Sequence, residues 1–363
     1  MAASSMIGLF QEHGPCRITN DSSSVTLNPF SWNNNANILY IDQPVGVGFS
    51  HGDLKVGTSQ QAAADIWTFM QIFFADSRFS SLQKNKLAIW TESYNQAIAA
   101  KNITGVPLNL QVLGVGDGLT DPLSQYPGYI TYAASNGYHP LVPSNVIAQA
   151  NSSWLQASNG CKALVYYVPT QNPDPYPPPI DKYLASIASK IGAEATWEET
   201  NENVYFNFSM TGDWMRNSRP DLETVINAGV RTIVYDGDAD YILNFNGVEA
   251  MVNNLNTTFT SLFQQQDFQT YTVAGQAAGQ FKNAGTSSYV RIYGAGHEFG
   301  TLAVGQAASQ FFEQIMANQS LSSVGSSKSN GASGLGARPC SGLFTGCALL
   351  FYLVFISLLC HPV

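Results

Sequence analysis

Charged residues are scarce in this chain of 363 residues. Asp, Glu, Lys and Arg make up 11% of it, against about 25% in an average soluble protein. The 16 Lys and Arg are spread along the chain, and the formal net charge is −9. Since a nucleic-acid-binding surface needs clustered basic side chains to neutralise phosphates, we expect no nucleic-acid partner. The hydrophobic content of 45% excludes disorder over most of the chain.

Cysteine is also rare, with five residues in all. No Cys-x-x-Cys pair or Cys/His cluster occurs, so we expect neither a metal site nor another cofactor. Cys16 and Cys161 either form one disulfide in an oxidising compartment or remain two buried thiols.

The signals for secretion disagree. Residues 1–10 lack a basic segment followed by a long apolar one, so no signal peptide is predicted in the chain as given. Sequons for N-glycosylation are nevertheless frequent, and we expect a glycoprotein of the secretory pathway, outside the cell or at its surface. The predicted glycosylation sites are Asn20, Asn102, Asn151, Asn207, Asn256 and Asn318.

The C-terminal residues 342–360 are apolar and uncharged. As a helix these residues would be about 28 Å long, close to the roughly 30 Å core of a bilayer. They follow a stretch of small polar residues and have no basic flank. We therefore expect a membrane association through a removable GPI signal, with attachment near Asn330, Gly331 and Ala332. A retained tail anchor and an apolar tail without a membrane role remain alternatives.

Short apolar runs alternate with helical patterns along the chain, which predicts a mostly parallel α/β sheet. A stretch rich in Tyr, Asn and Pro interrupts this alternation and is predicted to form an inserted cap subdomain. We expect an α/β core formed by residues 1–122 and 220–320, a cap at 123–219, a linker at 321–341 and the tail at 342–360. The predicted strands are 37–41, 87–90, 111–115, 231–235 and 289–293, and the predicted helices are 60–75 and 303–317.

Three residues with catalytic chemistry each follow a predicted strand: Ser93, Asp240 and His297. Nucleophile, acid and base come in this order in α/β-hydrolases. In that arrangement His297 takes the proton of Ser93, and Asp240 orients the imidazole. Taken singly, each residue has a simpler interpretation. Ser93 would be a helix N-cap, Asp240 a turn residue and His297 a surface loop residue.

Several segments carry a resemblance to a known family. They include NPFSW at 28–32, DQPVGVGFS at 42–50 and TESY at 91–94. Over about residues 4–320 the chain resembles the serine carboxypeptidases, an acid-acting branch of the α/β-hydrolase fold. The resemblance implies release of C-terminal amino acids from peptides and proteins at acid pH, through an acyl-enzyme.

The resemblance also implies roles for three further residues. Glu12 and Glu92 match the pair that binds the terminal carboxylate of the substrate, and the backbone N–H of Tyr94 matches an oxyanion-hole donor. Carboxyls brought together cannot all be ionised cheaply, so they share protons and substrate binding favours acid pH.

The sequence departs from the family at three places. A glycine-rich loop that would supply a second oxyanion donor has no counterpart before Ala3, and with it the N-terminal strands of the sheet are missing. About a dozen residues are missing after Tyr94, and a few after Glu298. These gaps reflect either errors in a gene model or a real truncation. A catalytically impaired surface glycoprotein and a related esterase or acyltransferase therefore remain alternatives, and the oligomeric state is not predicted.

Overall fold

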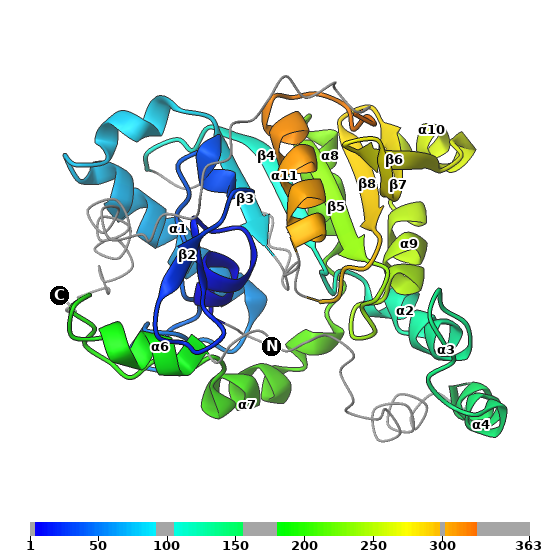
Figure 1. The fold of residues 1–363 in the computed structure, drawn as a ribbon, viewed down its shortest axis with the longest axis horizontal. Coiled ribbons are helices and arrows are strands. Elements are labelled where there is room, and N and C mark those ends of the chain that lie inside the picture. Colours follow the sequence, from blue (N-terminus) through cyan, green and yellow to red (C-terminus); the bar gives the residue numbers. More distant parts are fainter. Residues whose placement is uncertain (1–3, 92–104, 155–179, 298–301, 325–363) are drawn as a thin grey trace.

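The computed structural model describes residues 4–91, 105–154, 180–297 and 302–324. A six-stranded sheet forms the centre of this part of the chain (Figure 1). Its first four strands are parallel to one another, and the last two are antiparallel to their neighbours, which confirms the predicted mostly parallel α/β sheet. In spatial order the strands are β3 (Leu87–Thr91), β4 (Leu110–Gly116), β5 (Arg231–Gly237), β8 (Ser287–Ile292), β7 (Gln276–Ala284) and β6 (Gln269–Val273).

The register of the parallel strands brings their carboxyl ends to one edge of the sheet. Thr91 pairs with Val115, Gly116 with Tyr235, and Gly237 with Ile292. Ligands and catalytic groups of open α/β sheets lie beyond this edge. The loops that follow β4, β5 and β8 therefore start side by side.

Helices cover both faces of the sheet. On one face α11 (Leu302–Met316) buries Phe311 and Phe312 against Ile233 and Tyr235 of β5. On the other face α8 (Arg219–Asn227) and α9 (Phe245–Asn253) form a second core with Val234. Side chains of β5 alternate between the two cores because successive residues of a strand point to opposite faces.

Both predicted helices are present. The helix predicted at 60–75 is α1 (Ser59–Ala75), and the one predicted at 303–317 is α11. A capping box fixes the start of α1: the Thr58 hydroxyl accepts from the Gln61 backbone N–H, and the Gln61 side chain accepts from the Thr58 N–H.

The expectation of a strand at 37–41 is wrong, since these residues form no ladder. Their apolar side chains are used for packing instead. Leu39 packs beside α1, and Tyr40 is buried in the cluster around Phe10. A short apolar run indicates burial, and only backbone pairing makes it a strand.

The sequence interpretation also missed the hairpin of β6 and β7. Ala274 and Gly275 form its turn with positive φ angles of 50° and 82°, which suits the right-handed twist of a two-residue hairpin. The hairpin went undetected because its strands contain Gln, Asn, Thr and Gly rather than an apolar run.

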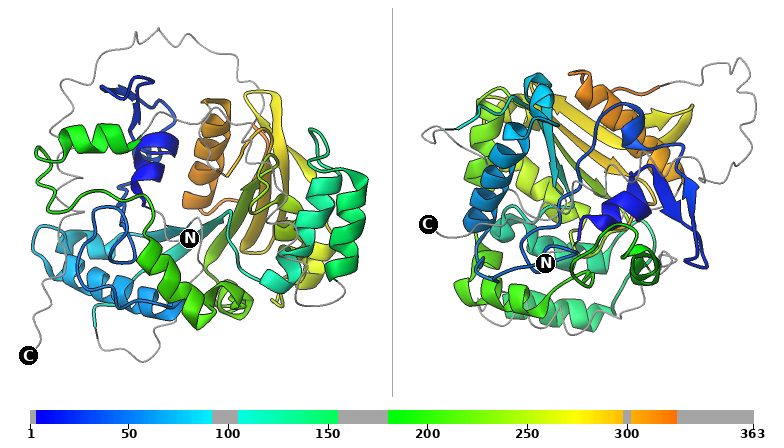
Figure 2. Two further views of the ribbon diagram at one scale, coloured as in Figure 1. Left: turned by 90° about the horizontal axis from the view of Figure 1, so that it is seen from below. Right: turned by 90° about the vertical axis from the view of Figure 1, so that its left-hand side faces the viewer.

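The N-terminal residues form a separate layer. A short π-helix, η1 (Gly8–Glu12), is followed by the two-stranded sheet of β1 (Cys16–Ile18) and β2 (Val25–Leu27) and by the 3-10 helix η2 (Trp32–Asn34). Figure 2 shows this layer next to α6 (Ile180–Ile187), and Met6 and Phe10 pack there against Tyr183 and Leu184.

Two of the remaining helices are short: the 3-10 helix η3 (Ser80–Lys84) precedes β3, and α10 (Thr260–Gln265) precedes β6. The others lie between β4 and β5 in the sequence. Among them, α2 and α3 pack against α9, on the side of the sheet opposite to α6 (Figures 1 and 2). No described helix is long and apolar enough to cross a membrane, and the tail predicted at 342–360 lies outside the described residues. These helices are α2 (Pro122–Gln125), α3 (Pro127–Ala134), α4 (Ser144–Trp154) and α7 (Glu202–Thr211), the last followed by the 3-10 turn η4 (Asp213–Met215).

Candidate active site

Asp240 lies in the loop that joins β5 to α9, and its side chain is buried. The backbone N–H groups of Ile242 and Leu243 donate to its Oδ1, at 2.7 and 3.2 Å. These two bonds leave Oδ2 to face the loop that follows β8. The local chain therefore fixes the direction in which the carboxylate points.

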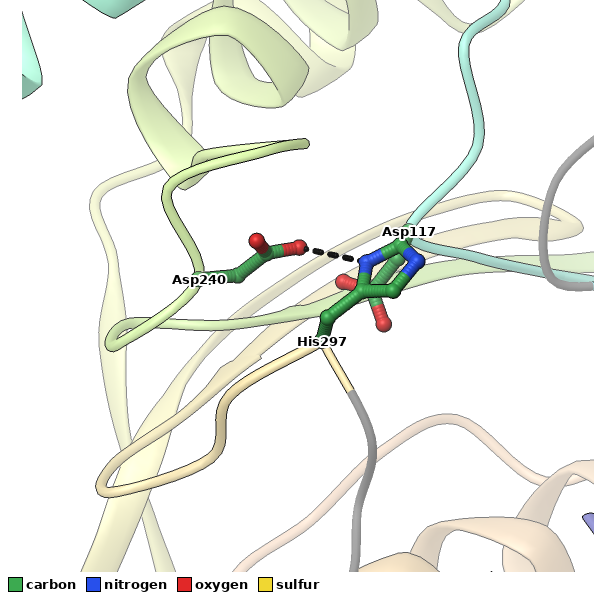
Figure 3. A group of neighbouring side chains, drawn as sticks. All are labelled: Asp117, Asp240 and His297. Carbon is green, nitrogen blue, oxygen red and sulfur yellow. Dashed lines mark hydrogen bonds and ion pairs between the residues drawn. The ribbon is translucent and has the colours of Figure 1, made fainter. Parts of the chain in front are cut away.

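His297 extends from the loop after β8 towards this carboxylate (Figure 3). Its Nδ1 lies 3.0 Å from Oδ2 of Asp240. The His297 side chain is 42% exposed, whereas that of Asp240 is 1% exposed. A carboxylate at Nδ1 favours the tautomer that carries its proton there, so Nε2 is the ring nitrogen whose lone pair can accept a proton from a nucleophile. A buried acid thus orients an accessible base.

The predicted nucleophile Ser93 lies outside the described residues. So do its predicted neighbours in the site, Glu92 and Tyr94, and the predicted glycosylation site Asn102. The strand that precedes Ser93 in the sequence is described. β3 ends at Thr91, paired with Val115, at the same edge of the sheet as the loops that carry Asp240 and His297. The structure brings together two of the three predicted triad members.

Glu12, the other predicted carboxylate-binding residue, is buried at the end of η1. Its Oε2 lies 3.7 Å from Nε2 of His13. The His13 ring stacks on Trp32, and its Nδ1 bonds the Tyr40 hydroxyl at 2.9 Å. A small cavity borders Glu12 and His13 and reaches Tyr235 of β5. Glu12 is therefore part of the packed interface between the N-terminal layer and the sheet.

The DQPVGVGFS segment holds the first described residues in place through hydrogen bonds to Asp42. Oδ1 of Asp42 accepts from the Ser4 hydroxyl at 2.6 Å and from the Ser5 N–H at 2.9 Å, and Oδ2 accepts from the Phe49 N–H at 2.9 Å. Burial raises the pKa of Asp42, and these hydrogen bonds partly oppose the rise. Gly48 has a φ of +64°, and a Cβ there would lie 2.0 Å from Oδ2 of Asp42, so this position requires glycine.

A second buried acid at the site was not singled out from the sequence. Asp117 follows β4 directly and is buried. One carboxylate oxygen of Asp117, one of Asp240 and a ring nitrogen of His297 all lie within 4.8 Å of one another (Figure 3). An acid one residue beyond a strand is the same signal that marked the Asp240 segment, and it was present here in Gly116-Asp117-Gly118.

These three side chains belong to types that also bind metal ions. Among the described residues they form the one group of three or more such side chains with their ligand atoms close together. The hydrogen bond between Nδ1 of His297 and Oδ2 of Asp240 accounts for the closeness of these two side chains without an ion.

The predicted glycosylation sites within the described residues differ in accessibility. Asn207 is half-buried, and its side-chain amide donates to the Leu54 carbonyl at 3.2 Å. The other four, Asn20, Asn151, Asn256 and Asn318, are exposed. Cys16 is buried, but Cys161 lies outside the described residues, so their disulfide stays a prediction.

Comparison with known proteins gives consistent matches. The family model for serine carboxypeptidases matches residues 2–174 and 177–318. Carboxypeptidase S1 of Penicillium janthinellum is 33% identical over an alignment of 371 positions, which covers 88% of this chain and 87% of that protein. Carboxypeptidase Y of Komagataella phaffii is 32% identical over an alignment of 342 positions. This alignment covers 81% of this chain but only 64% of the length of that protein.

A solved structure has the same fold. Kex1Δp, a prohormone-processing carboxypeptidase from Saccharomyces cerevisiae, superposes with a TM-score of 0.67 and 19% identity. The match covers 86% of this chain and 80% of that one. The α/β-hydrolase architecture predicted from the sequence is therefore correct.

Proposed function

Because the chain belongs to the serine carboxypeptidase family, we propose that it releases C-terminal amino acids from peptides and proteins at acid pH. The observation that carries the proposal is the bond from Nδ1 of His297 to the buried Oδ2 of Asp240, at 3.0 Å. This is the geometry that turns a histidine into the general base of a serine hydrolase.

In the proposed mechanism Nε2 of His297 takes the proton of the Ser93 hydroxyl as the serine oxygen attacks the last peptide carbonyl. Asp240 stabilises the imidazolium that forms, and the backbone N–H of Tyr94 donates to the oxyanion. His297 then gives its proton to the departing amino acid. A water molecule, deprotonated by His297, attacks the acyl-enzyme, and the peptide leaves shortened by one residue.

Glu12 and Glu92 are proposed to recognise the terminal carboxylate of the substrate. The burial of Glu12 supports this role, because a carboxylate binds a buried glutamate only if the pair shares a proton. Binding of this kind is strongest at acid pH and selects a free C-terminus.

The experiment combines labelling with turnover. A fluorophosphonate probe should label the purified protein at acid pH, and Ser93→Ala should abolish the label. A peptide with a free C-terminus should lose its last residue, whereas its C-terminally amidated counterpart should be cleaved far more slowly. A folded protein that takes no label would instead support the catalytically impaired glycoprotein. A labelled protein that cleaves esters but no peptides would support the esterase or acyltransferase.

We also propose that the chain passes through the secretory pathway as a glycoprotein and associates with a membrane through residues 342–360. Four exposed sequons support glycosylation. The mass lost on treatment with an N-glycosidase tests it, and release by a phosphatidylinositol-specific phospholipase distinguishes a GPI anchor from a retained span.

The proposed cap, residues 123–219 between the core parts 1–122 and 220–320, has contacts with the catalytic loop. The Tyr132 hydroxyl of α3 donates to the Asp238 carbonyl at 2.8 Å, and the Tyr129 hydroxyl donates to the Ile242 carbonyl. Both acceptors flank Asp240. Exchanging this region for that of a relative should change the preferred C-terminal residue while fluorophosphonate labelling persists.

A further inference from the structure

Asp117 reaches the His297 imidazole from a third strand. Asp240 comes from the loop after β5 and His297 from the loop after β8, whereas Asp117 follows β4. Figure 3 shows its carboxylate beside the imidazole ring. The nearest ligand atoms of the three side chains lie within 4.8 Å of one another, and Asp117 is 2% exposed. The catalytic imidazole thus has two buried carboxylates within reach.

The backbone holds Asp117 in this place. Its N–H donates to the Tyr235 carbonyl at 3.1 Å, which extends the pairing of β4 with β5 by one residue. Its φ is +40°, in the left-handed region that few residues other than glycine adopt. Such a conformation costs free energy and persists where the surrounding structure requires it, often at functional sites. The chain therefore presents a carboxylate at a position where a glycine would be less strained.

Two buried carboxylates at one imidazole have an electrostatic consequence. While the imidazole is neutral, ionised Asp117 and Asp240 repel each other across a short distance. When the imidazole gains a proton, both carboxylates attract it, because an opposite charge within about 4–6 Å favours the charged form. The pair of acids therefore stabilises the imidazolium more than Asp240 alone would.

The other titratable groups around this site have hydrogen-bond partners other than the His297 imidazole. Asp238 lies on the same loop as Asp240, but its Oδ1 accepts from the Tyr138 hydroxyl at 2.6 Å and from the Gly294 N–H at 2.7 Å. Burial raises the pKa of Tyr132 on α3, so this hydroxyl stays neutral. Burial also raises the pKa of Asp236 well above its usual range, and Asp236 is paired with Tyr289.

We propose that Asp117 is a second counter-charge for protonated His297, a positioning residue that acts through the imidazole and sets the pH at which it becomes a base. The inference rests on the proposed function in that it takes His297 as the general base. It adds a residue that the proposed triad does not contain.

The test follows the titration of His297 directly. The chain contains five histidines, so ¹⁵N-histidine NMR can resolve and assign them with single substitutions. In Asp117→Asn the midpoint of the His297 titration should fall by about one pH unit. The acidic limb of the kcat/KM profile should move by the same amount. The midpoint belongs to the three coupled groups together, so the shift between variants is the quantity to compare.

Two further variants make the test decisive. Asp238→Asn removes a neighbouring charge that is already engaged, and it should move the midpoint much less. Asp117→Gly suits the positive φ, so it keeps the inference testable if the asparagine variant does not fold. An unchanged His297 midpoint in both Asp117 variants, or an equal shift in Asp238→Asn, would overturn the inference. The NMR titration needs no turnover, so failure of the proposed peptidase activity is seen separately.

Discussion

Asp240 and His297 are 57 residues apart in the sequence, yet Oδ2 of one lies 3.0 Å from Nδ1 of the other. The contact exists because β5 and β8 are neighbours in the sheet, with Gly237 paired to Ile292 at their carboxyl ends. Each residue starts its loop from the same edge. The distance between them is therefore set by the pairing of these two strands in the sheet.

Replacing Asp240 by asparagine should remove most of the activity without unfolding the protein. Asparagine keeps the acceptor for the Ile242 and Leu243 N–H groups, but it no longer holds the proton on Nδ1 of His297. We expect a fall in kcat of about 10⁴-fold, as for loss of the acid in other triads, with little change in Tm. Asp221→Asn, at an ion pair with Arg216, is the matched control. A loss under tenfold would show that Asp240 does not orient the base.

The aromatic core below α11 should dominate stability. Phe311 is fully buried and contacts Trp32, Trp90 and Tyr235. Phe311→Ala should lower the free energy of unfolding by about 3–5 kcal/mol, since it removes a buried ring and leaves a cavity. Urea unfolding followed by tryptophan fluorescence measures this difference.

An exposed phenylalanine provides the control for this substitution. Phe206 on α7 is 60% exposed, so Phe206→Ala should change the free energy of unfolding by no more than about 0.5 kcal/mol. Equal effects of the two substitutions would mean that α11 is not packed on the sheet as described.

Much of the fold follows from apolar runs in the sequence, because a strand buried on both faces is mostly apolar. In β5 all seven residues are buried, and the apolar run is its middle, Ile233 to Tyr235; this run placed Asp240 a few residues beyond a strand end. The signal fails for β7, whose polar and small residues alternate between a half-exposed and a buried face. It also fails at 37–41, where apolar side chains pack into two hydrophobic clusters without a partner strand.

Asp117 shows why the site was only partly predicted. An acid between two glycines is ordinary turn chemistry, and nothing local separates a turn residue from one that faces an imidazole. The difference arises from strand order, since β4 lies next to β5. Which loops lie next to one another depends on the order of the strands in the sheet, and a single sequence does not reveal this order. Ser93 lies outside the described residues, so its place in the triad stays a prediction.

Glycosylation should discriminate among the sequons. Asn20, Asn151, Asn256 and Asn318 are exposed and should carry glycans. Asn207 should not, because its side-chain amide is half-buried and bonded to the Leu54 carbonyl. Peptide mapping after enzymatic deglycosylation in ¹⁸O-water measures the occupancy of each site. Full occupancy of Asn207 would mean that α7 is not docked on residues 54–57.

Stability should depend on pH through Asp236. Burial, and next the charge of Glu249, raise the pKa of Asp236 well above its usual range. Its Oδ1 accepts from the Tyr289 hydroxyl at 3.0 Å, and its Oδ2 has no hydrogen-bond partner among the described residues. Ionising this carboxyl in the folded protein is therefore costly, whereas in the unfolded chain it ionises near pH 4.

The sign of the effect follows from proton binding. Above about pH 4 the folded state holds a proton on Asp236 that the unfolded state has lost, so the stabilisation is complete below this pH and declines as the pH rises towards the folded pKa. Asp236→Asn keeps the shape and the Tyr289 contact but cannot ionise. The free energy of unfolding of the wild type, relative to this variant, should therefore fall between pH 4 and 7, by up to about 1.4 kcal/mol per pH unit. Chemical denaturation across that range measures the difference, with the exposed Asp267→Asn as control. Parallel pH curves for wild type and Asp236→Asn would show that Asp236 ionises in the folded protein as readily as in the unfolded chain.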